Sequence, residues 1–386
     1  MAISRLLSFI AAFAASGHVM LSAETSKPRA TVRSEGMTIK PITDGPDKGM
    51  QRAMQSFRFL LGQSTYEVRY TVRLNPDQPD KALPSEGYVG MPRPCSSNWY
   101  HSGFIFVRLN GKDIGTTRLH RAYVSETGKR ALADIVWDAE TARVRIRFAG
   151  QAGDNKLLAE IAIEPKAAIE RFEIYLRCYP SFFTAWHKRK GDRKVTTPST
   201  TLNQGQVIGL DVKDNSYAVY YDTIFDVAKG EGLGPCAAMF SPDTVAKAEF
   251  KVGSYAVNTN LVCDPGSRSV RLAFWEFPKV SNSDVLVSFR KDAAKWAEEL
   301  KAYDFTPSEV ESFDTKAELA ELARLSRPSE VRKNLGSKID RFRKQIEKLG
   351  SRDEKMGILQ QAQLLNVISD YREFLWELKL AALVAE

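Results

Sequence analysis

Alternation of apolar and polar residues predicts that the middle of the chain is built from β-strands. In residues 66–74 (YEVRYTVRL) every second side chain is apolar, which is the period of a half-buried strand. Residues 104–109 (FIFVRL) run into Asn110-Gly111, a strong signal for a two-residue hairpin turn. Residues 172–178 (FEIYLRC) alternate again. Further candidate strands are 134–137, 142–148, 157–163, 206–212, 217–221, 236–240, 248–252, 255–262 and 270–277.

Many short strands separated by turns, with few helical stretches between them, are typical of antiparallel sandwiches or barrels. The fold class predicted here is therefore mainly β, with an antiparallel β-sandwich body. The number of strands exceeds what one small sandwich usually holds. The body is thus either one large sandwich or two smaller ones, and the polar run 188–204 (KRKGDRKVTTPSTTLNQ) is the candidate break.

From Asp284 onward the pattern changes to the period of a helix. Thr306-Pro307-Ser308-Glu309 and 351–354 (SRDE) both match a capping box, which is a helix-start signal. Apolar residues then recur at alternating steps of four and three, first over 335–349 and again over 364–382. Two such seams joined by a short capped turn predict an all-α C-terminal helical hairpin or bundle.

These patterns divide the chain into five parts. Residues 1–23 resemble a signal peptide, with Arg5 ahead of a short apolar stretch and small residues before the expected cleavage site. Residues 24–56 are polar and are interpreted as a linker or arm. Residues 57–187 and 188–280 form the two parts of the β-sandwich body. Residues 281–386 form the helical C-terminal region. We therefore expect a secreted or periplasmic protein with no transmembrane segment after signal cleavage.

Charge and cysteine content refine this interpretation in two ways. The formal net charge is +8, a modest excess that is either a solvated surface or an attraction to a polyanion. Export makes a nucleic acid the least favoured polyanion. The four cysteines are Cys95, Cys178, Cys236 and Cys263. An oxidising compartment permits two disulfides with three alternative pairings, although a buried free thiol is equally compatible with the position of Cys178 on an apolar strand face.

Two aromatic segments are candidate ligand-binding sites. Residues 178–194 (CYPSFFTAWHKRKGDRK) place aromatic rings directly before a run of cations. Aromatic rings stack on sugar rings, and clustered cations attract sulfate or carboxylate groups. Residues 98–101 (NWYH) form a second aromatic loop. The predicted ligand-binding residues are Trp99, Tyr100, His101, Phe183, Trp186, His187, Lys188, Arg189, Lys190 and Arg193. The alternative for both segments is a core plug beside a solvated loop.

The segment 220–234 (YYDTIFDVAKGEGLG) is the candidate catalytic site. Asp222, Asp226 and Glu231 lie close together in sequence, and paired carboxylates act as acid and base or as nucleophile in glycoside hydrolysis. No cofactor is predicted, and no metal site is assigned, although the same oxygens would also suit Ca²⁺. The alternative is a turn-rich connection whose acids face water. Nucleophile-elbow, Walker, dinucleotide and zinc-protease motifs are absent from the sequence.

The sequence therefore supports three functional hypotheses. The first is an exported carbohydrate-interacting protein that binds a glycan, with some preference for an acidic one; the architecture resembles sugar-handling β-sandwich proteins at the level of the fold alone. The second is a glycan-degrading hydrolase or lyase that uses Asp222, Asp226 or Glu231. The third is an envelope assembly protein that associates with itself or with a protein partner through residues 305–386. The sugar, the linkage and the oligomeric state are not specified.

Overall fold

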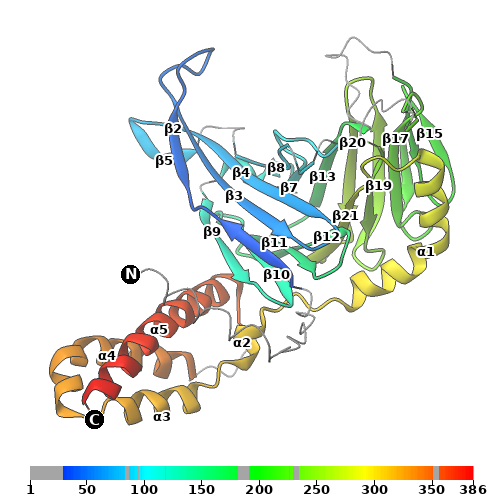
Figure 1. Ribbon diagram of the computed structural model, residues 1–386. Coiled ribbons are helices and arrows are strands. Elements are labelled where there is room, and N and C mark those ends of the chain that lie inside the picture. Colours follow the sequence, from blue (N-terminus) through cyan, green and yellow to red (C-terminus); the bar gives the residue numbers. More distant parts are fainter. Residues whose placement is uncertain are drawn as a thin grey trace, which may run out of the picture.

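Two antiparallel sheets face each other and form one large β-sandwich, followed by five helices (Figure 1). The computed structural model describes residues 29–82, 87–93, 95–96, 98–117, 119–180, 191–225, 227–228, 234–350 and 356–385. The predicted signal peptide and the basic run 181–190 lie outside these ranges. The mainly-β sandwich with an all-α C-terminal region is confirmed, and the sandwich is the single large one of the two alternatives.

The first sheet contains twelve strands in the order β1-β3-β4-β6-β7-β13-β20-β19-β16, with β2, β5 and β8 paired beside this path. Their bounds are β1 Thr31–Ser34, β2 Thr38–Pro41, β3 Gln51–Leu60, β4 Thr65–Asn75, β5 Gln78–Ala82, β6 Tyr88–Gly90, β7 Ile105–Leu109, β8 Lys112–Asp113, β13 Phe172–Cys178, β16 Val207–Asp211, β19 Val245–Val252 and β20 Val257–Cys263. A short 3₁₀ turn, Ile114–Thr116, follows β8.

The second sheet contains nine strands in the order β15-β14-β17-β18-β21-β12-β11-β10-β9. Their bounds are β9 Leu119–Glu126, β10 Arg130–Asp138, β11 Ala142–Gln151, β12 Lys156–Pro165, β14 Arg193–Thr196, β15 Thr201–Asn203, β17 Tyr217–Asp222, β18 Cys236–Phe240 and β21 Ser269–Glu276. Both sheets therefore combine strands from before and after the run 188–204.

The N-terminal arm is more ordered than its polar composition suggests. β1 and β2 both pair with β3, with Val32 opposite Phe59 and Ile39 opposite Ala53. All four residues of β2 are nevertheless exposed. A ladder of backbone hydrogen bonds can hold an edge strand that buries little apolar surface, so apolar alternation gave no signal here.

The inward faces of the two sheets share one core. Alternate residues of β4, such as Tyr66, Val68 and Tyr70, pack against residues of the second sheet such as Ile135 and Ile146. The outward residues of β4 are polar, as the alternation predicts. The four cysteines are free in this structure. Cys178 and Cys236 are both buried in this core, and burial raises the pKa of the Cys236 thiol.

Helix α1 (Asn282–Ala302) covers part of the outward face of the second sheet (Figure 1). Ser281 caps it, accepting a hydrogen bond from the Asp284 backbone N–H at 3.1 Å. Phe289 packs against Tyr217 and Trp275. Strands such as β18 are buried on both faces, so their sequences are continuous apolar runs. In the strands of the first sheet, by contrast, apolar and polar residues alternate.

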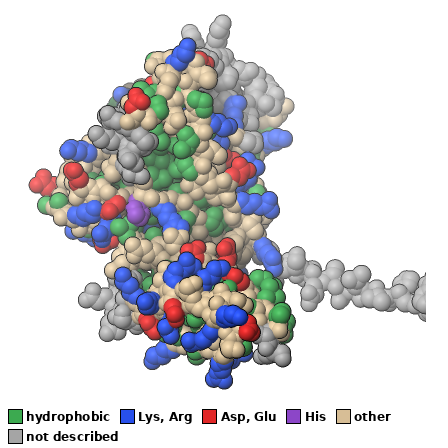
Figure 2. Space-filling model, turned by 90° about the vertical axis from the view of Figure 1, so that its left-hand side faces the viewer, with side chains coloured by type: hydrophobic (Ala, Val, Ile, Leu, Met, Phe, Trp, Pro, Cys, Tyr) green, Lys and Arg blue, Asp and Glu red, His purple; other side chains and the backbone are tan. Residues whose placement is uncertain are grey.

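The remaining helices form a separate core. Their bounds are α2 Ser308–Ser312, α3 Thr315–Leu325, α4 Ser329–Gly350 and α5 Ile358–Ala385. The predicted seams meet between α4 and α5, where Phe342 stacks on Phe374 with ring centroids 4.9 Å apart. Figure 2 shows Lys and Arg side chains spread over this helical part, at the bottom of the view, with acidic side chains among them. No helix in the described part of the chain is long and apolar enough to cross a membrane.

Candidate functional site

Two paired strands of the first sheet present aromatic and arginine side chains on the outward face. In β13, Ile174 and Leu176 point into the core, so Tyr175 and Arg177 point outward and are half-buried. In β7 the same alternation turns Phe106 and Arg108 outward. Phe106 lies directly opposite Tyr175 in the antiparallel register. We call these four residues, together with Tyr100, Tyr179 and Tyr255 at the sheet end, the aromatic–arginine face.

The guanidinium groups of this face lie over its rings. The Cζ atom of Arg108 is 4.7 Å from the centroid of the Tyr175 ring. The Cζ atom of Arg177 is 5.6 Å from the Tyr175 ring centroid and 5.9 Å from that of Phe106. Such cation–π contacts hold long side chains in fixed positions on an exposed sheet. The face therefore holds two kinds of planar group in fixed positions, aromatic rings and arginine guanidinium groups.

Amide and carboxylate groups on the next strands extend the polar surface. Arg177 donates from Nε to Asn258 Oδ1 at 3.3 Å. Asn260, opposite Tyr175 in β20, donates from Nδ2 to Glu173 at 2.7 Å and to Glu249 at 3.2 Å. Its Oδ1 atom is buried and accepts no hydrogen bond from the described residues. A hydroxyl-bearing ligand would find donors in the arginines and an acceptor in the exposed carboxylate of Glu249 beside the rings.

Three tyrosines close one edge of the face. The Tyr100 and Tyr179 rings meet edge to face with centroids 4.5 Å apart, and Tyr179 meets Tyr255 at 4.9 Å. The hydroxyl groups of Tyr179 and Tyr255 are hydrogen-bonded. Burial raises the pKa of Tyr179, so its hydroxyl stays neutral at physiological pH. Tyr255 is 49% exposed, which leaves a ring accessible at the rim.

His101 neighbours this edge as a neutral side chain. Its ring centroid is 4.9 Å from that of Tyr100. Partial burial lowers the pKa of His101, and the nearby Arg93 and Arg69 lower it further. A neutral imidazole offers one donor and one acceptor. The predicted site residues Tyr100 and His101 thus lie together at the edge of the aromatic–arginine face.

Trp99 anchors the loop that carries Tyr100. Its indole is 1% exposed and packs edge to face against Phe274 at 5.1 Å and Tyr220 at 5.8 Å. Its Nε1 donates to the Trp275 carbonyl at 3.3 Å. The prediction that Trp99 stacks on a ligand is therefore wrong, because both faces of the ring are covered by the core. The alternative of a core plug holds for this residue.

Glu276 fixes the same loop from the second sheet. Its carboxylate accepts hydrogen bonds from the Ser96 hydroxyl, from Asn98 Nδ2 at 2.7 Å and from the backbone N–H groups of Asn98 and Trp99. Burial raises the pKa of Glu276 to about 7, against the effect of these donors. Glu276 therefore couples the two sheets at the end where Tyr100 leaves the core.

Asp222 and Arg193 lie inside the sandwich rather than on its surface. Asp222 is 0% exposed and accepts backbone hydrogen bonds from Asp192 at 3.0 Å and Ile224 at 3.1 Å. A Cβ atom on Gly191 would lie 2.0 Å from its Oδ2 atom. The structure therefore argues against the catalytic role predicted for Asp222, because a carboxylate enclosed by a turn has no access to a polymer.

Arg193 is 2% exposed and pairs opposite Asp222 in the ladder. Its Nη1 donates to the Ser254 carbonyl, beside Tyr255. Burial lowers the pKa of Arg193, and the charge of Asp222 partly offsets this effect. Arg193 is thus a support beneath the tyrosine edge, and its buried guanidinium group is not exposed for the ligand binding that was predicted for it.

The other predicted site residues lie outside the described residues. They are Phe183, Trp186, His187, Lys188, Arg189, Lys190, Asp226 and Glu231. Their roles, including the Ca²⁺ alternative, stay predictions. Among the residues that the structure describes, no three His, Cys, Asp or Glu side chains gather in a way that would hold a metal ion.

Sequence reasoning missed the four central residues of the face. The signal was present as two matching tripeptides, Phe106-Val107-Arg108 and Tyr175-Leu176-Arg177. Each lies in a strand whose alternate residues are apolar, so the aromatic and the arginine necessarily share the solvent side. Large aromatic residues on that side of a strand are unusual enough to mark a binding surface.

Comparison with known proteins finds only distant structural likenesses. No protein-family model and no curated protein matches the sequence. A candidate aldose 1-epimerase from Klebsiella pneumoniae aligns over 70% of this chain and 99% of its own, with 11% identity and a TM-score of 0.37. The GH36 α-galactosidase AgaB from Geobacillus stearothermophilus aligns over 62% of this chain, with 13% identity and a TM-score of 0.32, and this chain spans 41% of its length. At these values the likeness transfers neither a site nor an activity, and this chain is described as a large antiparallel β-sandwich with a C-terminal helical region.

Proposed function

We propose that this protein is exported and binds a glycan that carries acidic groups, through the aromatic–arginine face. One observation carries the proposal: guanidinium groups and aromatic rings alternate on paired strands, and each of these side chains is partly exposed to solvent. Aromatic faces bind the apolar side of a sugar ring. Arginine forks bind carboxylate or sulfate in two parallel hydrogen bonds.

The geometry favours an acidic glycan over a neutral one. Arg108 and Arg177 sit over the rings, so a sugar stacked on Tyr175 would place a ring substituent beside a guanidinium group. Asn258, opposite Arg177 in β20, would meet a hydroxyl group of the same sugar. The predicted signal peptide supports the proposal, because an exported protein meets envelope and extracellular polysaccharides. The hydrolase alternative now depends on Asp226 and Glu231, and soluble fragments released from a polysaccharide would support it.

Replacing Tyr175 by Ala is expected to weaken binding to a polyuronate about tenfold or more, because a stacking surface is lost while the net charge is unchanged. Arg177→Gln should give a loss of similar size and also flatten the salt dependence. The measurement is affinity electrophoresis of residues 24–386 in native gels that contain polyuronate or neutral dextran.

The matched control is Lys344→Gln, which removes one exposed cation from α4, far from the face in sequence and on a different element. It should bind like the parent protein. Equal weakening by Lys344→Gln and Arg177→Gln would show that retardation reports only the net positive charge and would remove the face from the proposal. Circular dichroism verifies that each variant is folded.

We also propose that the helical region associates with a second copy of this chain through α5. One side of α5 packs on α4, yet Trp376 is 67% and Leu383 70% exposed, and Leu380 between them is also exposed. Positions i, i+4 and i+7 form one continuous stripe. Arg372 and Lys379 flank one side of this stripe, where they pair with acids of α3, and Glu377 flanks the other, where it pairs with Lys338. In a parallel pair of α5 helices the cationic side of one copy faces the acidic side of the other, as in a parallel coiled coil.

Replacing Trp376 and Leu380 together by Ser is expected to convert a concentration-dependent dimer into a monomer, because the apolar contact is lost while the α4 side of α5 is untouched. Light scattering after size-exclusion chromatography measures the change. The paired control is Lys291→Ser on α1, which should leave the dimer intact. A parent protein that stays monomeric at the highest accessible concentration would contradict self-association, and capture of a different partner would then need separate evidence.

A further inference from the structure

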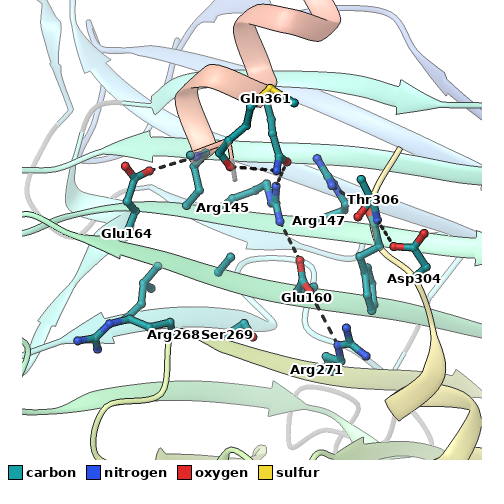
Figure 3. Close-up of a pocket in the computed structure, with 16 residues that line it drawn as sticks. Arg145, Arg147, Glu160, Glu164, Arg268, Ser269, Arg271, Asp304, Thr306 and Gln361 are labelled. Atoms are coloured by element: carbon teal, nitrogen blue, oxygen red, sulfur yellow. Dashed lines mark hydrogen bonds and ion pairs between the residues drawn. The ribbon is translucent and has the colours of Figure 1, made fainter. Parts of the chain in front are cut away.

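A cavity of about 440 Å³ lies between the outward face of the second sheet and the helical region. Strands β11 and β12 and the start of β21 form its floor, which carries Arg145, Glu160 and Ser269. The segment after α1 and the start of α5 form its walls, which include Thr306 and Gln361 (Figure 3). The volume lies in the range of small-molecule sites.

Arg145 is the central side chain of this cavity. Its side chain is 8% exposed. It donates from Nη1 to Gln361 Oε1 at 2.6 Å and from Nη2 to Glu160 Oε2 at 2.8 Å (Figure 3). Its Nε atom is fully buried and has no hydrogen-bond partner among the described residues. Each Nη atom carries two N–H donors, so each has a second donor for a ligand in the cavity.

The cations around the cavity are incompletely neutralised. Glu160 serves both Arg145 and Arg271, whose Nε lies 3.8 Å from it. Arg268 has no carboxylate partner among the described residues; its contact is with the Ser267 carbonyl at 3.4 Å. Arg147 is different, because Asp134 neutralises it with two hydrogen bonds. Arg145 and Arg271 therefore share the carboxylate of Glu160, and Arg268 contacts no carboxylate among the described residues.

The other acids of the cavity wall are already engaged. Glu164 accepts from the Ile358 N–H at 3.0 Å and from Arg143 Nη1 at 2.9 Å. Asp304 accepts from the Thr306 N–H at 2.8 Å. Their negative charges would disfavour a ligand with two or three charges. Their remaining lone pairs suit hydroxyl donors.

We infer that this cavity binds a small monoanionic polyhydroxy acid, such as a free uronic acid. The carboxylate would sit beside the guanidinium group of Arg145, and Arg268 would contribute its positive charge from the exposed rim of the cavity (Figure 3). The hydroxyl groups would meet Glu160, Ser269 and Gln361. The site uses the opposite sheet from the aromatic–arginine face, shares no residue with it and does not depend on the proposed glycan binding.

Binding at this site would stabilise the docking of the helical region on the sandwich. The ligand would contact β11 and β12 on one side and α5 on the other, so it would bind only the docked arrangement. A ligand that binds one state stabilises that state in proportion to the logarithm of its concentration over Kd. Added ligand should therefore raise the melting temperature and protect α5 from hydrogen exchange.

The test is isothermal titration of residues 24–386 with sodium glucuronate, with glucose and inorganic phosphate as separate probes. We expect saturable glucuronate binding with a Kd of about 1 mM or tighter, at least tenfold weaker binding of glucose and phosphate, and protection of residues 358–365 from hydrogen exchange. No glucuronate binding at about ten times that concentration would overturn the inference. Equal binding of glucose would show that the carboxylate contributes nothing to affinity and would contradict the anion site. Tighter binding of phosphate would contradict the assignment of the ligand as a polyhydroxy acid.

Two variants locate the site. Arg268→Gln changes a side chain whose one described hydrogen bond is to a neighbouring backbone carbonyl, so it should fold normally and bind glucuronate at least tenfold more weakly. Lys344→Gln, on α4 and outside both the cavity and the aromatic–arginine face, should leave glucuronate affinity unchanged. Unchanged affinity in Arg268→Gln, or an equal loss in Lys344→Gln, would place the bound acid elsewhere and overturn the assignment of the cavity. Polyuronate retardation of Arg268→Gln should match the parent protein, which separates this inference from the proposed function.

Discussion

Replacing Asp134 by Ala is expected to lower the free energy of unfolding by about 3–5 kcal/mol, because it leaves the guanidinium group of Arg147 buried without a counter-charge. Both side chains are at most 1% exposed, and Arg147 donates to the two carboxylate oxygens at 2.6 and 2.8 Å. Arg147 also holds the segment after α1 through the Phe305 carbonyl at 2.7 Å. Urea unfolding at neutral pH measures the loss.

The control for this prediction removes both charges. Asp134→Leu combined with Arg147→Met keeps the site filled with apolar volume and should lose less stability than Asp134→Ala alone, since no unpaired charge remains. Asp138→Ala, at a partly exposed ion pair with Arg143 in the same sheet, should cost at most about 1 kcal/mol. If Asp134→Ala lost no more stability than Asp138→Ala, the buried pair would not be a determinant of stability.

Replacing Glu276 by Ala is expected to lower the free energy of unfolding by about 2–5 kcal/mol, because the donors of Ser96, Asn98 and Trp99 would lose their shared acceptor. The loop that carries Tyr100 would detach from the second sheet. Chemical unfolding measures the first effect, and increased hydrogen exchange of residues 98–101 measures the second. Stability and exchange like those of the parent protein would contradict the role assigned to Glu276.

The same carboxyl predicts a pH dependence with a definite sign. The pKa of Glu276 is raised from 4.5 to about 7 in the folded chain. Between these two pH values the folded state therefore holds a proton that the unfolded state has released. The stability that this proton contributes is fully present below about pH 4.5 and is lost as the pH rises through about 7. Glu276→Gln cannot titrate, so its stability should lack this decline. A parallel pH profile in the two proteins would contradict the raised pKa.

Local patterns were sufficient to predict the helical hairpin and many of the strands, although β3 and β9 were not predicted. The alternation of β4 and the four-and-three spacing in α5 each report which face of one element is buried, and such information is contained in a short window. β2 escaped prediction because its backbone pairing with β3 leaves its side chains exposed. The burial of Trp99 was not predicted for a different reason. The sequence of an aromatic loop next to a strand does not distinguish a ring that faces solvent from one that packs in the core.

The candidate sites depend on contacts between distant residues, and this limits what the sequence predicts. Tyr175 and Arg177 share the outward face of β13 by local alternation, but their pairing with Phe106 depends on which strands become neighbours. Arg145 and Gln361 are 216 residues apart in sequence and hydrogen-bond across the cavity. No spacing rule anticipates such a pair. Asp222 was misassigned because an acidic turn reads alike whether its carboxylate faces solvent or binds its own backbone.

The most direct test of the central claim is affinity electrophoresis of residues 24–386 in native gels that contain polyuronate, with the double variant Tyr175→Ala and Arg177→Gln beside the parent protein. The proposal predicts that polyuronate retards the parent protein, that neutral dextran does so far less, that salt reduces the retardation, and that the double variant migrates as though no polysaccharide were present. Equal retardation of the parent protein and the double variant would contradict glycan binding by the aromatic–arginine face.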